Sequence, residues 1–175
     1  MELRRQYWDS SVFCSFLNKE ENRYETVSNL LKEARAGRLE IVTSSFALVE
    51  VLKIDGSKPI TDKQEDDLKK FFEFPFIKLI VPDREICERA RFYFWRHKFA
   101  PKDALHMATA ERAGKISQIH ELFSWDGDFY NKNGTTPVNI PISQPFVRQP
   151  LLNLPEHEDT IEADDTPAPT ILPED

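Results

Sequence analysis

The sequence predicts an α/β protein in which helices flank a central parallel β-sheet of four to five strands. Short apolar runs alternate with helical patterns along residues 5–140, which is typical of a parallel sheet. The chain has 175 residues, of which 40% are hydrophobic, so it can form one domain with its own core. Turn residues and helix caps separate most of the runs, so each run can be assigned to one element.

Four runs are predicted as strands from their length and their apolar or β-branched residues. They lie at residues 5–9, 39–43, 77–81 and 122–125, and residues 138–140 are a candidate fifth strand. Pro82 ends the third strand, because proline cannot continue a ladder of backbone hydrogen bonds.

The first half of the chain contains three predicted helices. A short helix follows the first strand, with one apolar face made by Val12, Phe13, Phe16 and Leu17. The second helix spans residues 24–36 and stops at Gly37. Ser44 or Ser45 is expected to cap the third, which carries Glu50.

The remaining helices are predicted from their caps. Residues 61–64, Thr-Asp-Lys-Gln, form a capping box for a helix that reaches about residue 72. Asp83 is expected to cap a helix over residues 84–97. Asp103 opens a further helix that closes at Gly114.

The C-terminal part of the chain differs in composition from the rest. Residues 141–175 hold eight acids against one base and seven of the twelve prolines, whereas residues 1–140 hold equal numbers of acids and bases. We predict a domain at 1–140, an extended segment at 141–154 that is a candidate to pack on it, and a disordered acidic tail at 155–175. The net charge of −7 therefore belongs to the C-terminal part and does not argue against a nucleic-acid substrate.

Composition also bounds the compartment. No segment approaches the roughly 18 consecutive apolar residues of a membrane helix, and the N-terminus lacks the apolar core of a signal peptide. The two cysteines, Cys14 and Cys87, lie in apolar or helical contexts rather than in a disulfide framework. We expect a cytoplasmic protein without membrane attachment.

Four carboxylic acids stand at the edges of apolar runs, where an ionised side chain without a partner is costly. They are Asp9, Glu50, Asp103 and Asp126. Asp9 and Asp126 follow the first and fourth predicted strands, and open parallel sheets bind ligands beyond the carboxyl ends of their strands. At least one element separates successive acids, so all four can reach a common edge of the sheet.

A divalent cation would stabilise acids gathered at one edge. Two carboxylates ~5 Å apart repel each other by about 3 kcal/mol at an effective dielectric constant of 20. Mg²⁺ or Mn²⁺ would bind the carboxylate oxygens, orient a water molecule for attack on a phosphoryl group and neutralise the leaving oxygen. One of the acids could accept the proton of that water.

Each acid also has a simpler structural interpretation. Asp9 and Asp103 both stand where they could cap a helix, and Asp126 could be an ordinary turn residue. Glu50 fits neither role easily, because it interrupts an apolar run. His106, three residues after Asp103, is a candidate ligand or base, but we favour a structural role for it.

Four segments together resemble the ordered motifs of the PIN-domain family. They are Trp8–Phe13, Ser45–Val51, Asp103–Ala110 and Phe123–Phe129. The resemblance covers about residues 5–140 and implies a Rossmann-like fold and a metal-dependent endoribonuclease, similar to the VapC-type toxins of toxin–antitoxin pairs. The bulky Trp125 and the acidic tail depart from the usual pattern, but no acid is missing.

The resemblance implies roles for individual residues. The quartet that binds Mg²⁺ or Mn²⁺ corresponds to Asp9, Glu50, Asp103 and Asp126. Asp128 is a fifth candidate ligand, and Ser11 and Ser124 match positions where the family often keeps a hydroxyl beside the carboxylates. The expected partners are RNA, with tRNA as one candidate, a protein antitoxin and a second copy of the chain.

Substrate contacts are less sharply defined. Lys102, beside Asp103, is the best single candidate for a contact to phosphate. Residues 84–98 interleave basic and aromatic side chains, which could bind RNA but are better explained as core aromatics beside a solvated basic face. The acidic tail is either an inert extension or a segment that competes with RNA.

Two other functions stay open. One is a catalytically silent PIN-fold protein that binds RNA or acts as a scaffold. The other is a phosphohydrolase that acts on small molecules with a similar sheet. Metal-stimulated RNA cleavage that is lost in Asp103→Asn would separate the nuclease from the silent protein.

Overall fold

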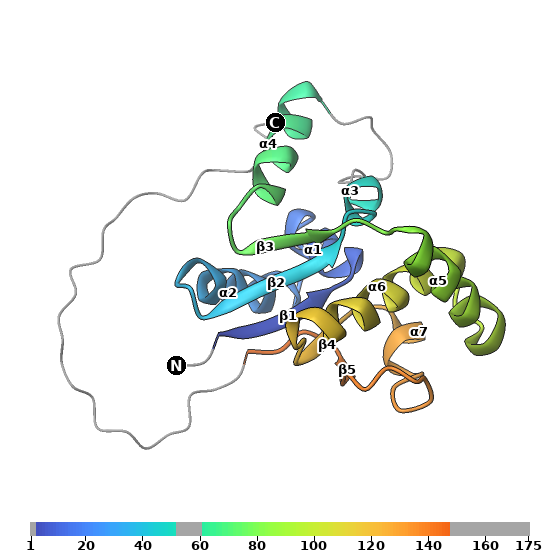
Figure 1. Ribbon diagram of the computed structural model, residues 1–175. Coiled ribbons are helices and arrows are strands. Elements are labelled where there is room, and N and C mark those ends of the chain that lie inside the picture. Colours follow the sequence, from blue (N-terminus) through green and yellow to red (C-terminus); the bar gives the residue numbers. More distant parts are fainter. Residues whose placement is uncertain (1–2, 52–60, 148–175) are drawn as a thin grey trace, which may run out of the picture.

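A five-stranded parallel sheet forms the centre of the protein in the computed structural model, which describes residues 3–51 and 61–147 (Figure 1). The strand order is β3-β2-β1-β4-β5, and every neighbouring pair is parallel. The strands are β1 (Arg4–Trp8), β2 (Leu39–Ser44), β3 (Ile77–Ile80), β4 (Glu121–Phe123) and β5 (Ile142–Ser143). The predicted α/β class with a parallel sheet is confirmed.

Helices cover both faces of this sheet. They are α1 (Ser10–Leu17), α2 (Tyr24–Arg35), α3 (Ala47–Glu50), α4 (Asp62–Phe72), α5 (Arg84–His97), α6 (Pro101–Ser117) and α7 (Gly127–Tyr130). Successive strand residues point to opposite faces, so they enter two different cores. Tyr7 and Leu122 pack with residues of α5, α6 and α7, whereas Trp8 and Phe123 pack with residues of α1, α2 and α4.

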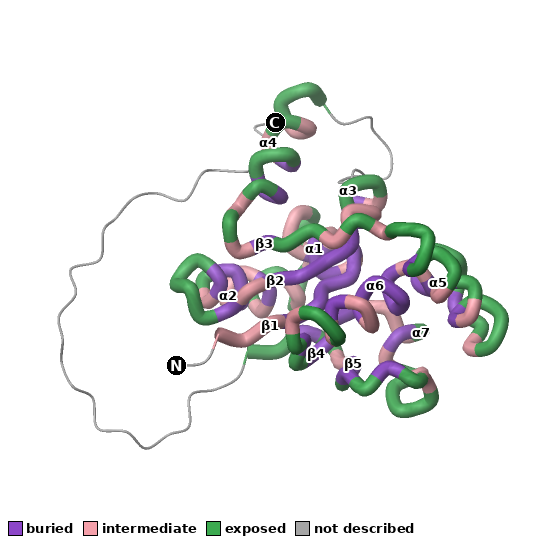
Figure 2. The backbone as a smooth tube through the Cα atoms, in the orientation of Figure 1, coloured by how far each residue is buried: buried purple, intermediate pink, exposed green. Residues whose placement is uncertain are grey.

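The most buried backbone lies in the central strands and in α6 (Figure 2). Helix α6 contributes a run of small residues, including Ala104, Ala108 and Ala110, that are at most 2% exposed. Small side chains let this helix lie close to the sheet and to α5, whose Tyr93 is fully buried in the same core. This close packing carries the first turn of α6 to the edge of the sheet where β1 and β2 end.

Two predicted helix caps are confirmed. Oδ1 of Asp83 accepts a hydrogen bond of 2.9 Å from the backbone N–H of Ile86 at the start of α5. Thr61 and Gln64 form the reciprocal capping box of α4. These caps satisfy backbone donors that an α-helix leaves unpaired in its first turn.

The predicted bounds of α6 are wrong at both ends. The helix begins at Pro101, with Ala100 as the N-cap, because the fixed φ of proline suits the first helical position. The helix continues past Gly114 to Ser117. Gly114 instead leaves space for the side chain of Ile140, since a Cβ atom at position 114 would lie 2.8 Å from Cδ1 of Ile140.

The predicted fifth strand and the predicted cap of α3 are also wrong. The fifth strand is Ile142–Ser143 and not residues 138–140, because backbone bonds from Leu122 to Pro141 and from Ser124 to Ser143 set the register. Neither predicted serine caps α3, whose N-cap is Phe46 and has no side-chain cap bond. Ser44 Oγ accepts from the Phe46 N–H just ahead of this one-turn helix.

Part of the C-terminal segment belongs to the fold. Residues 142–143 extend the sheet beside β4, and the Phe146 ring lies 5.4 Å from that of Phe123, centroid to centroid. The acidic tail predicted at 155–175, and residues 148–154 before it, lie outside the described residues. Within the described part of the chain, no helix has the length and apolar character needed to span a bilayer.

Candidate functional site

The strand order places two of the predicted acids beside each other. Strands β2 and β3 lie on one side of β1, and β4 pairs with the other side of β1. The strand order therefore reverses between β1 and β4, which is where open α/β sheets bind their ligands. Asp9 directly follows β1 and Asp126 lies just after β4, so both stand at the carboxyl ends of these neighbouring strands.

Asp9 is a buried carboxylate whose two oxygens are both engaged. It is 3% exposed, and its Oδ1 accepts from Ser11 Oγ at 2.6 Å and from the Val12 N–H at 3.4 Å. Its Oδ2 accepts from Ser124 Oγ at 2.7 Å. Burial raises the pKa of Asp9, although the charge of His106 and the two serine hydroxyls oppose this.

The two serines predicted to lie beside the carboxylates also shape the loop after β4. Ser11 Oγ accepts a hydrogen bond of 2.9 Å from the Trp125 N–H, and Ser124 Oγ accepts one of 2.9 Å from the Asp126 N–H. Each hydroxyl therefore donates to Asp9 and accepts from this loop. Asp9 caps α1 as the simpler interpretation required, and it is held at the sheet edge at the same time.

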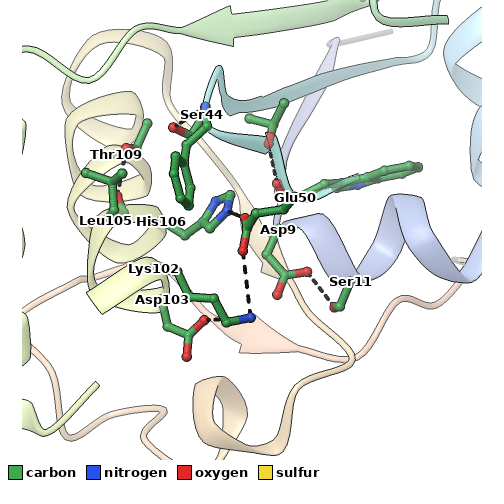
Figure 3. Close-up of polar contacts among 12 residues, drawn as sticks. Asp9, Ser11, Ser44, Glu50, Lys102, Asp103, Leu105, His106 and Thr109 are labelled. Atoms are coloured by element: carbon green, nitrogen blue, oxygen red, sulfur yellow. Dashed lines mark hydrogen bonds and ion pairs between the residues drawn. The ribbon is translucent and has the colours of Figure 1, made fainter. Parts of the chain in front are cut away.

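Glu50 lies at the end of the one-turn helix α3, with its side chain 13% exposed. Its Oε2 is 2.6 Å from Nε2 of His106, and its Oε1 is 3.7 Å from Nζ of Lys102 (Figure 3). Burial opposes ionisation of this group. Hydrogen bonds from His106 and Ser10 and the charges of His106 and Lys102 outweigh burial, so the pKa of Glu50 is lowered.

Asp103 and Lys102 lie in the first turn of α6. Asp103 is 5% exposed, and its Oδ1 is 3.6 Å from Nζ of Lys102. Burial raises the pKa of Asp103, and so do the charges of Asp126, Asp9 and Glu50, against the attraction of Lys102. Since the helix N-cap is Ala100, the alternative that Asp103 caps this helix is wrong.

The charges of the same four acids also shift the pKa of Lys102. Burial lowers the pKa of this ammonium, but the carboxylates outweigh it and hold the pKa above its usual value. In order of effect they are Asp103, Glu50, Asp126 and Asp9. The four acids and the lysine therefore form one electrostatic cluster, although their elements are far apart in the sequence.

Asp126 and Asp128 lie at the rim of this cluster. Asp126 is half-buried and caps α7, with its Oδ1 accepting from the Asp128 N–H at 2.9 Å. The simpler interpretation was an ordinary turn residue, whereas the structure makes Asp126 the cap of a helix at the sheet edge. The Asp128 residue is exposed.

The donor set suits a hard divalent cation, but it is not drawn together as a finished coordination sphere. Within residues 3–51 and 61–147, no three His, Cys, Asp or Glu side chains lie close enough together to hold a metal ion. The cluster nevertheless presents four carboxylates against one ammonium, and burial and mutual repulsion raise the pKa of Asp103. Magnesium keeps several of its waters and needs few protein carboxylates, so an open acidic site fits its chemistry.

Two residues of this site were not assigned a functional role from sequence. His106 is 1% exposed and contacts Glu50, and its Nδ1 lies 2.9 Å from the Tyr7 hydroxyl. Tyr7 precedes Asp9 by two residues, so alternation along a strand directs both toward the same face. That spacing was the available signal, but only the packing of α6 against β1 reveals the contact.

The basic and aromatic segment at residues 84–98 divides between core and surface. Tyr93 is buried as expected, whereas Phe94 and Trp95 are 44% and 62% exposed. Arg84 and Arg89 form ion pairs with Glu88 and Glu111, at 2.8 and 2.6 Å. The interpretation that all these aromatics are core is therefore wrong for two of them.

The fold and the acidic cluster define an α/β protein with a negatively charged site at the point where the strand order reverses. The model of the PIN domain matches residues 7–134, and the chain belongs to this family. The resemblance seen in the sequence motifs is thus confirmed. No curated protein is similar enough in sequence to be counted as a relative.

Three solved structures have a similar fold. VapC20 of Mycobacterium tuberculosis, a toxin that cleaves the sarcin–ricin loop, has a TM-score of 0.55 and 17% identity, covering 70% of this chain and 91% of that one. VapBC2 of Rickettsia felis bound to promoter DNA has a TM-score of 0.54 and 17% identity, covering 80% of this chain and 98% of that one. FitAB bound to the IR36 DNA fragment has a TM-score of 0.52 and 14% identity, covering 83% of this chain and 99% of that one.

Proposed function

We propose that this protein is a divalent-metal-dependent endoribonuclease of the toxin type. The observation that carries the proposal is the gathering of Asp9, Glu50, Asp103 and Asp126 around Lys102 at the edge of the sheet. Burial of carboxylates with few cationic partners weakens the fold, so such a cluster is better explained by a ligand than by stability. The toxin that cleaves the sarcin–ricin loop, VapC20, supports RNA as the substrate class.

The four acids would hold Mg²⁺ or Mn²⁺, with Asp128 available at the rim. When bound, the cation would neutralise charge on the scissile phosphate and lower the pKa of an attacking water. Ser11 and Ser124 keep both oxygens of Asp9 oriented through their hydrogen bonds. A carboxylate of the cluster would accept the proton of the attacking water.

Lys102 would bind a phosphate oxygen of the RNA. Its side chain is 55% exposed, and its ammonium lies between Glu50 and Asp103. A flexible lysine that is partly solvated can turn toward a phosphate and leave the two carboxylates to a cation. This position beside the acids supports its role in placing the scissile bond over them.

We further propose a protein antitoxin as a partner, and a cytoplasmic location. The similar structures VapBC2 and FitAB were solved bound to DNA, VapBC2 to a fragment of its own promoter. Both cysteines are free, Cys14 half-buried and Cys87 exposed, which suits a reducing compartment. Light scattering of the purified protein would test whether it also forms a homodimer.

A catalytically silent PIN protein is the second candidate. Two observations favour it. Among the described residues, no three acids lie close enough together to hold a metal ion, and the ammonium of Lys102 lies between Glu50 and Asp103. Such a protein would bind RNA without cutting it. The two candidates differ in one measurable property, metal-stimulated cleavage.

The test is cleavage of a mixed pool of tRNA and structured RNA by purified protein, with Mg²⁺ or Mn²⁺ and with chelator. Asp103→Asn removes one carboxylate of the cluster, and Glu88→Gln removes an exposed carboxylate of α5 as a matched control. We expect cuts that need metal, persist in Glu88→Gln and vanish in Asp103→Asn. RNA binding without cleavage by the folded wild-type protein would favour the silent alternative.

A further inference from the structure

His106 is buried in the core, yet both of its ring nitrogens are engaged by polar groups. Nε2 lies 2.6 Å from Oε2 of Glu50, and Nδ1 lies 2.9 Å from the hydroxyl of Tyr7. The rings of Tyr7 and Phe46 pack edge-on against the imidazole, with centroids 6.0 and 6.3 Å away. Hydrogen bonds of a buried ring are costly to lose, so the ring orientation is well determined.

The chemistry of the partners assigns the donors. A carboxylate only accepts hydrogen bonds, so Nε2 of His106 carries a proton and donates to Glu50. The hydroxyl of Tyr7 can donate or accept, so it satisfies Nδ1 whether or not that nitrogen carries a proton. Burial and the charge of Asp9 raise the pKa of Tyr7 well above its usual range, so this phenol stays protonated.

Glu50 needs an external support of this kind. It ends α3, a single helical turn, and so short a helix has little stability of its own. His106 in contrast sits on the 17-residue helix α6, packed against the sheet. The histidine holds Oε2, whereas Oε1 faces Lys102, on the side where Asp9 and Asp103 lie (Figure 3).

We propose that Tyr7 and His106 are positioning residues that hold one oxygen of Glu50 so that the other faces the cation site. The inference rests on the proposed function, since it concerns the same acidic site. Neither residue touches the substrate, and both act only through Glu50. A histidine that merely filled the core would affect folding but not cation affinity.

Four variants separate these roles. In His106→Gln the amide nitrogen can take the place of Nε2 and keep the donor to Glu50, whereas in His106→Asn it reaches only the position of Nδ1. His106→Leu fills the space without a donor, and Tyr7→Phe removes only the phenol hydroxyl. Mn²⁺ affinity of each folded variant is measured by calorimetry, and thermal unfolding is recorded in parallel.

We expect His106→Gln to keep Mn²⁺ affinity within about 3-fold of wild type, and His106→Asn and His106→Leu to lose about 10–100-fold. Tyr7→Phe should fall between them, and it keeps the inference testable if His106→Leu fails to fold. In a Glu50→Gln background, His106→Asn should have no further effect, because its action passes through that carboxylate. An equal loss in both backgrounds would overturn the inference.

The proton on Nε2 of His106 gives a readout that needs no metal. Nitrogen NMR of the wild-type protein should show a proton on Nε2 of His106 that is hydrogen-bonded to Glu50. An Nε2 without a proton, or wild-type Mn²⁺ affinity in folded His106→Asn, would overturn the positioning role alone. A wild-type protein that binds no Mn²⁺ would instead overturn the proposed function together with this role.

Discussion

The hydroxyl of Ser124 donates a 2.7 Å hydrogen bond to Oδ2 of Asp9, across 115 positions of the sequence. Ser124 follows β4 and Asp9 follows β1, so the bond joins the two strands at the point where the strand order reverses. The same hydroxyl accepts from the N–H of Asp126. One buried serine thus links two acids of the candidate site.

Ser124→Ala should destabilise the protein by about 1–3 kcal/mol, because it leaves a buried carboxylate oxygen without its donor. Urea unfolding measures the change in the free energy of unfolding. Ser143→Ala is a matched control on the neighbouring strand, since its hydroxyl oxygen is buried without a hydrogen-bond partner in the described structure. The control should cost about 0.5 kcal/mol or less. Equal losses in both variants would contradict this account.

Asp103→Asn should stabilise the protein in the presence of chelator, by roughly 0.5–2 kcal/mol. Burial and three neighbouring carboxylates disfavour the charge of Asp103 more than Lys102 favours it, as the raised pKa of Asp103 indicates. Mg²⁺ should then raise the melting temperature of the wild type but not that of the variant, because only the wild type binds it well. A variant less stable than wild type without metal would contradict the charge argument.

Lys102→Met should change two affinities in opposite directions. It removes the ammonium 3.7 Å from Glu50 and 3.6 Å from Asp103, so Mn²⁺ should bind more tightly. RNA should bind more weakly, and the slope of log affinity against log salt should fall by about one. Fluorescence anisotropy at several salt concentrations measures this slope. Lys69→Met, an exposed lysine on α4, should leave both affinities unchanged.

Glu111→Gln should lower stability in a pH-dependent way. Glu111 accepts from Arg89 and Tyr93 at 2.6 and 2.7 Å, and Lys115 lies 3.0 Å away. Burial raises the pKa of Glu111, but these three partners outweigh burial and lower it. A lowered pKa stabilises the native state above the unfolded-state pKa, and this stability is lost as pH falls through the folded-state value.

The deficit of Glu111→Gln should therefore be about 1–2 kcal/mol near pH 7 and shrink below about pH 4. Unfolding by urea at several pH values measures it. Partial exposure of the ion pairs means that added salt should reduce the deficit. A deficit that is constant down to acid pH would assign the effect to packing instead of charge.

Gly114→Ala should be destabilising, although alanine favours a helix by about 1 kcal/mol over glycine. The new Cβ atom would lie 2.8 Å from Cδ1 of Ile140 and 3.4 Å from its Cγ1. Ile140→Val removes Cδ1, so Gly114→Ala should cost at least about 1 kcal/mol less in that background. A double-mutant cycle of thermal unfolding measures this coupling. Additive effects would show that the isoleucine moves away freely.

Local patterns predicted the elements whose signals are carried by neighbouring residues. The caps at Thr61 and Asp83 and the apolar strand runs were identified because each depends on a few adjacent side chains. The errors at the C-terminal end of α6 and at β5 have one cause. The close approach of Ile140 requires a glycine at position 114 within the helix, and pairing with β4 sets the register of β5. Neither contact is local in the sequence.

The sequence by itself determined the fold class, the family motifs and the four acids. The spacing of apolar residues and the position of an acid beside an apolar run depend only on the order of the residues. The tertiary structure decided which atoms meet. It placed Lys102 between Glu50 and Asp103, tied Ser124 to Asp9, and joined Tyr7 and His106 to Glu50. These contacts arise from the packing of α6 on the sheet and from the pairing of β1 with β4. Both bring together residues that no local pattern connects.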